Sequence, residues 1–153
     1  GLATDQVHGV GAESAEDMRK AVHRSLSEDG CDFYISAAAI SDFAPVPVKG
    51  KIRSGKRQAI ELSPLPKILD EVLAASPHPL TIAFKLGSDA ESAARRMLKK
   101  GAAMVVTNAP ETIGSEQGVY VLVLATGSTE LSGTKEEIAY GIWDSVLALG
   151  AGP

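Results

Sequence analysis

The chain has 153 residues, of which 44% are hydrophobic and 22% charged, and its formal net charge is −4 at pH 7. This composition fits one folded domain over residues 1–153 and excludes a disordered chain. No apolar run reaches the roughly 18 residues of a membrane-spanning helix, and residues 1–10 do not resemble a secretory signal. The negative charge gives no general attraction to nucleic acid. We therefore expect a cytoplasmic domain that binds neither membranes nor nucleic acids.

The single cysteine, Cys31, excludes an internal disulfide. Three scattered histidines do not supply the partners that a zinc site needs, so the residues predict no metal-ligand set. We expect Cys31 to be a buried packing residue.

The first half of the chain predicts one helix, one strand and an exposed loop. Ser14 with Asp17 forms a capping box before apolar residues at helical spacing, and residues 32–40 are typical of a buried strand. Residues 41–55 are rich in proline, glycine and lysine, which predicts an exposed, mobile loop or ribbon. An edge strand at residues 58–62 and a helix over residues 65–74, opened by Pro64, follow.

The second half repeats strand and helix more plainly. Residues 80–85, 103–107 and 119–124 are expected strands. Capping boxes predict helices that begin at Ser88, with Glu91, and at Thr134, with Glu137; Gly101 closes the first of them and Gly150 the second. This order of elements predicts an α/β, Rossmann-like fold with an open, mostly parallel sheet flanked by helices.

Ligands of such sheets bind beyond the carboxyl ends of the strands, which draws attention to Asp42, to residues 84–87 and to Asn108. The Asp42 carboxylate could accept hydrogen bonds from a ribose or a base, or it could cap a neighbouring turn. The loop cations are Lys49, Lys51, Arg53 and Lys56. They could close over a phosphate ester, or they could belong to an ordinary solvated loop.

Arg96 and Lys100 share one face of their helix by four-residue spacing and could bind the β and γ phosphates of a nucleotide. The alternative is that basic residues are favoured near a helix C-terminus by the helix dipole. No GxxxxGK[ST] loop and no GxGxxG fingerprint is present, so the pattern supports neither a P-loop ATPase nor a nicotinamide dehydrogenase.

An ordered set of segments nevertheless resembles phosphopantothenoylcysteine synthetase, and the likeness covers nearly the whole chain. The segments are Ser-Ala-Ala-Ala-Ile-Ser-Asp-Phe at 36–43, Lys-Ile-Arg at 51–53, Leu-Pro-Lys-Ile-Leu at 65–69, Ala-Phe-Lys at 83–85, and 99–108. In bacteria and archaea this enzyme is usually the C-terminal half of a bifunctional flavoprotein whose other half is a decarboxylase.

The resemblance implies a site. Lys51 would be the catalytic lysine of a mobile loop that handles the acyl-nucleotide intermediate, besides binding the nucleotide. The other implied nucleotide-binding residues are Ser36, Ala37, Ala38, Asp42, Pro66, Lys67, Ile68, Leu69, Phe84, Arg96 and Lys100. The nucleotide would contact the backbone of 36–38 and the Asp42 carboxylate, and Phe84 would pack against it. Its base would lie against 66–69 and its triphosphate against Arg96 and Lys100.

The resemblance also implies the reaction. The carboxylate of 4'-phosphopantothenate attacks the α-phosphate of CTP, with Mg²⁺ present, and the amine of cysteine then displaces the nucleotide. A homodimer and a decarboxylase flavoprotein domain, in cis or in trans, are the implied protein partners.

The sequence departs from the family in two places. It lacks the family's N-terminal glycine-rich segment, which predicts a truncated domain and leaves open whether that domain is active alone. Leu65 and Lys67 stand where the family has asparagine and aspartate, which leaves the base preference open between CTP and ATP. Two other function classes stay open: a non-catalytic α/β nucleotide-binding or partner-binding module, and another nucleotide-using enzyme on a similar sheet.

Overall fold

The computed structural model describes residues 7–28, 30–51, 54–55, 57–108, 112 and 114–150. These residues group into two compact units. Unit 1 consists of Gly1–Asp29 with Ala39–Ile68, and unit 2 of Gly30–Ala38 with Leu69–Pro153. The single-domain organisation expected over residues 1–153 stays a prediction.

Unit 1 contains helix α1 (Ala15–Glu28) and a two-stranded antiparallel ribbon of β2 (Phe43–Pro45) and β3 (Leu62–Pro64). The capping box that predicted α1 is present: the Ser14 hydroxyl accepts from the Asp17 N–H, and the Asp17 carboxylate accepts from the Ser14 hydroxyl. The predicted helix start is therefore confirmed, because the first turn obtains the partners that its amides lack within the helix.

The ribbon confirms the predicted exposure of this region but corrects two boundaries. The paired strand is Leu62–Pro64 instead of residues 58–62, and helix α2 (Ile68–Ala74) begins three residues later than expected. The Leu65 amide donates to the Asp42 carbonyl at 2.8 Å, so it continues the ribbon. Pro66 disfavours helical backbone at Leu65, which delays the helix. Arg53 and Lys56 lie outside the described residues.

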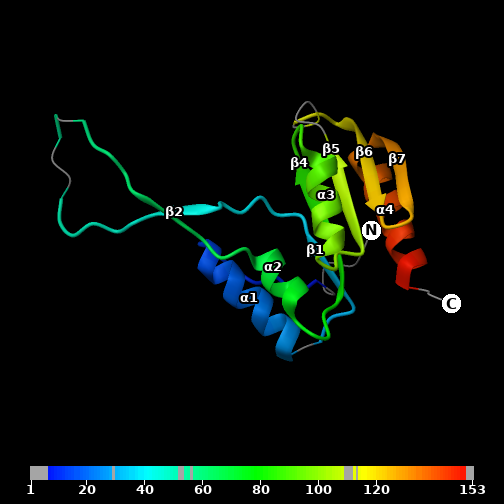
Figure 1. Cartoon of the computed structure of the whole chain (residues 1–153), viewed down its shortest axis with the longest axis horizontal. Coiled ribbons are helices and arrows are strands. Elements are labelled where there is room, and N and C mark those ends of the chain that lie inside the picture. The colour runs from blue at the N-terminus through cyan, green and yellow to red at the C-terminus, as the bar shows by residue number, and fades with distance from the viewer. Residues whose placement is uncertain are drawn as a thin grey trace. The chain divides into compact units, whose positions relative to one another are not determined.

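Unit 2 is built on a five-stranded sheet in the order β1-β4-β5-β6-β7 (Figure 1). The strands are β1 (Phe33–Ser36), β4 (Leu80–Leu86), β5 (Met104–Asn108), β6 (Gln117–Leu124) and β7 (Gly127–Thr134). β1, β4 and β5 are parallel, whereas β6 and β7 run antiparallel. The α/β, Rossmann-like fold class is confirmed.

β7 was not predicted, because its sequence, Gly-Ser-Thr-Glu-Leu-Ser-Gly-Thr, is polar and lacks the alternation of a half-buried strand. It forms by pairing with β6 across a short turn at the edge of the sheet. β1 covers only part of the predicted 32–40 run, and Cys31 before it is exposed, not buried, with its thiol donating to the Phe33 carbonyl.

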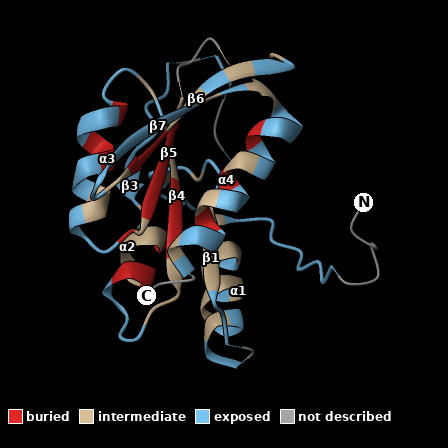
Figure 2. Ribbon diagram, turned by 90° about the vertical axis from the view of Figure 1, so that its right-hand side faces the viewer, coloured by how far each residue is buried: buried red, intermediate tan, exposed pale blue. Residues whose placement is uncertain are grey.

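Helices cover both faces of the sheet. On one face α2 and α3 (Ala90–Lys99) pack on β4, β5 and β6 through a core that includes Leu73, Ala94 and Val105. On the other face α4 (Lys135–Gly150) packs through Ile138, Ile142 and Val146. The buried residues concentrate on β4, β5 and the inner faces of these helices (Figure 2).

The capping box predicted at the start of α4 is confirmed, whereas the one predicted at the start of α3 is wrong. At α4 the capping box is confirmed, since Thr134 and Glu137 exchange hydrogen bonds. At α3 the box predicted from Ser88 is wrong: Asp89 is the N-cap residue and makes no side-chain cap bond, while Glu91 pairs with Arg95 at 3.2 Å. A carboxylate in the first turn of a helix can also form an ion pair with a basic residue four positions later.

Candidate functional site

The carboxyl ends of the three parallel strands meet at one edge of the sheet, which is called the carboxyl edge below. Ser36 at the end of β1 is paired with Ala83 of β4, and Leu86 of β4 with Asn108 of β5. Phe84 follows Ala83 and is half-buried. The structure therefore brings Ser36 and Phe84, both predicted nucleotide-binding residues, to the same edge. Ala37 and Ala38 continue from Ser36 and are exposed.

Tyr34 supports Ser36 from within the strand. The two side chains lie on the same face of β1 because side chains alternate along a strand. Burial raises the pKa of Tyr34, and its hydrogen bond with the Ser36 side chain opposes that rise. The Tyr34 side chain is thus a hydrogen-bond partner of Ser36 beside the carboxyl edge. The period-two spacing of Tyr34 and Ser36 could have indicated this pair from the sequence.

Two exposed apolar side chains accompany Phe84. Ile35 is paired with Ile82, and Leu86 lies two residues beyond Phe84, so all three side chains lie on the face of the sheet that carries α4. Ile35 is 45% and Leu86 40% exposed. An apolar surface at the ends of β1 and β4 suits the flat face of a base or ribose. Sequence reasoning named residues 84–87 but not Ile35, because the pairing of β1 with β4 is not visible in the sequence.

The turn between β4 and α3 lies at the same edge. Gly87 has φ +129°, and its amide donates to the Asn108 carbonyl at 3.4 Å. A side chain is strained at this φ, which explains a glycine here. α3 then begins without a side-chain cap. The amino end of a helix favours negative charge, which the carboxylates of Asp89 and Glu91 supply here.

In unit 1 the structure brings Asp42 and Lys67 together. The Lys67 ammonium lies 3.7 Å from the Asp42 carboxylate, and each side chain is 63% exposed. Pro66 beside Lys67 is exposed, Ile68 is buried and Leu69 is half-buried. Lys51 is exposed in the connection between the ribbon strands.

The two cations predicted to bind the triphosphate have different carboxylate partners. Arg96 lies 3.8 Å from Asp89 and donates to the Ser92 hydroxyl at 3.2 Å, so it points toward the amino end of α3. Lys100 bonds Asp70 of α2 at 2.8 Å. Their shared contact with a triphosphate stays a prediction.

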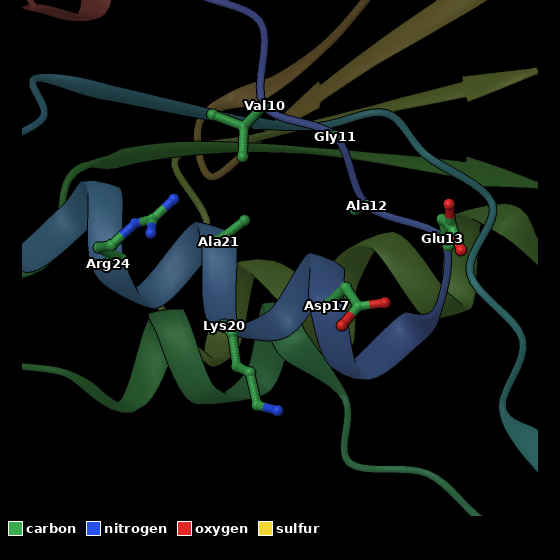
Figure 3. A pocket seen from close by; sticks show the side chains of 8 residues that line it. All are labelled: Val10, Gly11, Ala12, Glu13, Asp17, Lys20, Ala21 and Arg24. Atoms are coloured by element: carbon green, nitrogen blue, oxygen red, sulfur yellow. The ribbon is translucent and has the colours of Figure 1, made fainter.

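A groove of about 510 Å³ lies between residues 10–13 and α1 (Figure 3). Its charged residues already interact locally: Lys20 pairs with Glu16, and the Ser14 hydroxyl lowers the pKa of Asp17. None of the predicted site residues lines it; its lining is Val10, Gly11, Ala12, Glu13, Asp17, Lys20, Ala21 and Arg24. The sequence-predicted residues lie instead at the carboxyl edge of unit 2 and on the ribbon of unit 1, which are described separately.

Within the described residues, no three histidine, cysteine or acidic side chains are grouped so that they could hold a metal ion. No helix in the described part of the chain is long and apolar enough to cross a membrane.

The chain matches a known protein family. Residues 2–149 match the model of the DNA/pantothenate metabolism flavoprotein C-terminal domain. A curated relative, the coenzyme A biosynthesis bifunctional protein CoaBC of Thermococcus kodakarensis, is 35% identical over 148 residues, which cover 90% of this chain and 36% of the relative. The chain thus spans about a third of that protein's length.

Two solved structures share the fold. The C-terminal domain of a coenzyme A biosynthesis bifunctional protein CoaBC aligns with a TM-score of 0.71 and 28% identity, over 90% of this chain and 63% of the other. The DNA/pantothenate metabolism flavoprotein of Streptococcus pneumoniae aligns with a TM-score of 0.75 and 22% identity, over 90% and 71%.

Proposed function

Because the chain belongs to the family of DNA/pantothenate metabolism flavoprotein C-terminal domains, we propose that it acts in coenzyme A biosynthesis as a phosphopantothenate–cysteine ligase domain. Its 35% identity to a bifunctional coenzyme A biosynthesis protein supports the pathway. The observation that carries the ligase proposal is the carboxyl edge, where the exposed backbone after Ser36 and the half-buried face of Phe84 lie at the ends of neighbouring strands.

The proposed reaction has two steps. The carboxylate oxygen of 4'-phosphopantothenate attacks the α-phosphorus of CTP, so an acyl-cytidylate forms and pyrophosphate leaves. The amine of cysteine then attacks the acyl carbon, the bond to CMP breaks, and the amine loses a proton as the amide forms. No covalent bond to the protein is needed, so positioning and charge stabilisation supply the catalysis.

The residues divide these tasks. The backbone of 36–38 and the face of Phe84 orient the nucleotide, and the Asp42 carboxylate accepts hydrogen bonds from it. Lys51 places a positive charge on the exposed loop between β2 and β3, where it neutralises charge on the α-phosphate as the acyl-cytidylate forms and reacts. Arg96, at the same face of α3 as Asp89, holds the phosphates.

Residues 66–69 are the proposed base contacts. Lys67 brings an ammonium to within 3.7 Å of Asp42, so this part of the site holds one donor group and one acceptor group. Cytosine and adenine both place an amino group beside an acceptor atom, so this pair fits either base, and CTP is proposed from the family resemblance alone.

Mg²⁺ would enter this proposal with the phosphates of the nucleotide. It supplies charge neutralisation on the phosphates. We also propose a homodimer and a decarboxylase domain as protein partners, with the exposed apolar ribbon described below as the dimer surface.

Calorimetric titration of CTP, with Mg²⁺, into the wild-type chain and its Asp42→Asn variant tests the nucleotide site. We expect saturable binding that Asp42→Asn weakens about tenfold, since a charged acceptor is replaced by a neutral one. The matched control is Asp144→Asn, which removes an exposed carboxylate on α4, outside the proposed site. Equal affinity of both variants for CTP would show that Asp42 does not contact the nucleotide.

The same titration with ATP decides the base preference. Stronger binding of ATP than of CTP would contradict the cytosine contact proposed for residues 66–69. Release of pyrophosphate when 4'-phosphopantothenate and CTP are mixed with the protein measures the first chemical step, and its loss in Lys51→Ala with CTP binding retained is the expected result for a residue that acts on the reacting phosphate.

A further inference from the structure

No further inference is drawn: the strongest candidate, the apolar surface patch of Tyr140, Trp143 and Leu147 on α4, which continues through the ring contact of Trp143 onto Phe33 of the outermost strand β1, carries nothing because the described part of the chain does not show what covers it.

Discussion

Asp42 and Lys67 form an exposed ion pair next to the ribbon. At 63% exposure each, their pairing at 3.7 Å contributes at most about 1 kcal/mol. A ligand that offers the Asp42 carboxylate a better donor can therefore displace Lys67 at small cost. The pair thus neutralises the carboxylate in the free protein without blocking it, which would suit the nucleotide site proposed above.

Glu137 provides a prediction for pH dependence at the residue scale. The Thr134 amide and hydroxyl donate to its carboxylate at 2.8 and 2.9 Å and hold the pKa of Glu137 below its usual value. A lowered folded pKa means that the stabilisation is present above the unfolded pKa and is lost as the pH falls through the folded pKa. We expect Glu137→Gln to unfold at lower urea than the wild type at pH 7, with the two midpoints converging in acid.

Urea unfolding at a series of pH values measures this effect. Glu136→Gln is the control, since it removes a neighbouring carboxylate for which the structure records no cap bond. A Glu137→Gln deficit that stays constant into acid would show that the charge is not what stabilises the cap.

At the scale of elements, α4 illustrates what helical spacing determines. Ile138, Ile142 and Val146 recur at four-residue intervals and are all buried, while Tyr140 between them is 63% exposed. The stripe faces Met104, Val106 and Leu122 of the sheet. The sequence predicts the stripe, but the partner strands follow from the topology.

Truncation of the stripe tests this packing. Ile138→Ala is expected to lower the free energy of unfolding by about 2–4 kcal/mol, because it removes a side chain that is 4% exposed and leaves a cavity. Tyr140→Ala is the comparison on the same helix and is expected to change it by about 0.5 kcal/mol or less. Denaturant titration gives both values; similar losses would contradict the assigned inner face.

At the scale of the whole molecule, the ribbon of unit 1 and the residues that connect its two strands expose large apolar side chains. Phe43, Val48, Ile60 and Leu62 are 54%, 69%, 71% and 56% exposed. Contiguous exposed apolar side chains mark interaction surfaces. This observation supports the proposed homodimer, since a second ribbon would offer the same side chains in return.

Light scattering during size exclusion tests the dimer. We expect the wild type to elute as a dimer and Ile60→Lys to weaken association at least about tenfold, since an apolar contact is replaced by a charge. Val119→Lys, at a 48% exposed position of β6, is the control. A wild-type monomer at all concentrations, or equal weakening by the control, would rule out the ribbon as the interface.

Much of the fold could be predicted because it depends on local signals. Capping residues at Ser14 and Thr134 place helix starts, and apolar runs place β4, β5 and most of β6. β7 could not be predicted, since a polar edge strand exists only through its partner. The start of α2 depended on Leu65 joining the ribbon, which is a contact with a residue 23 positions earlier.

Only part of the candidate site could be predicted from the sequence. Sequence order alone identified the residues that follow each strand and the family that they resemble, because chemistry at strand ends leaves a local pattern. Only the tertiary structure decided that Ile35 and Leu86 flank Phe84, that Lys67 pairs with Asp42, and that Lys100 forms an ion pair with Asp70. The reason is physical: periodicity records which face a side chain takes, whereas the partner of a charge depends on how distant segments pack.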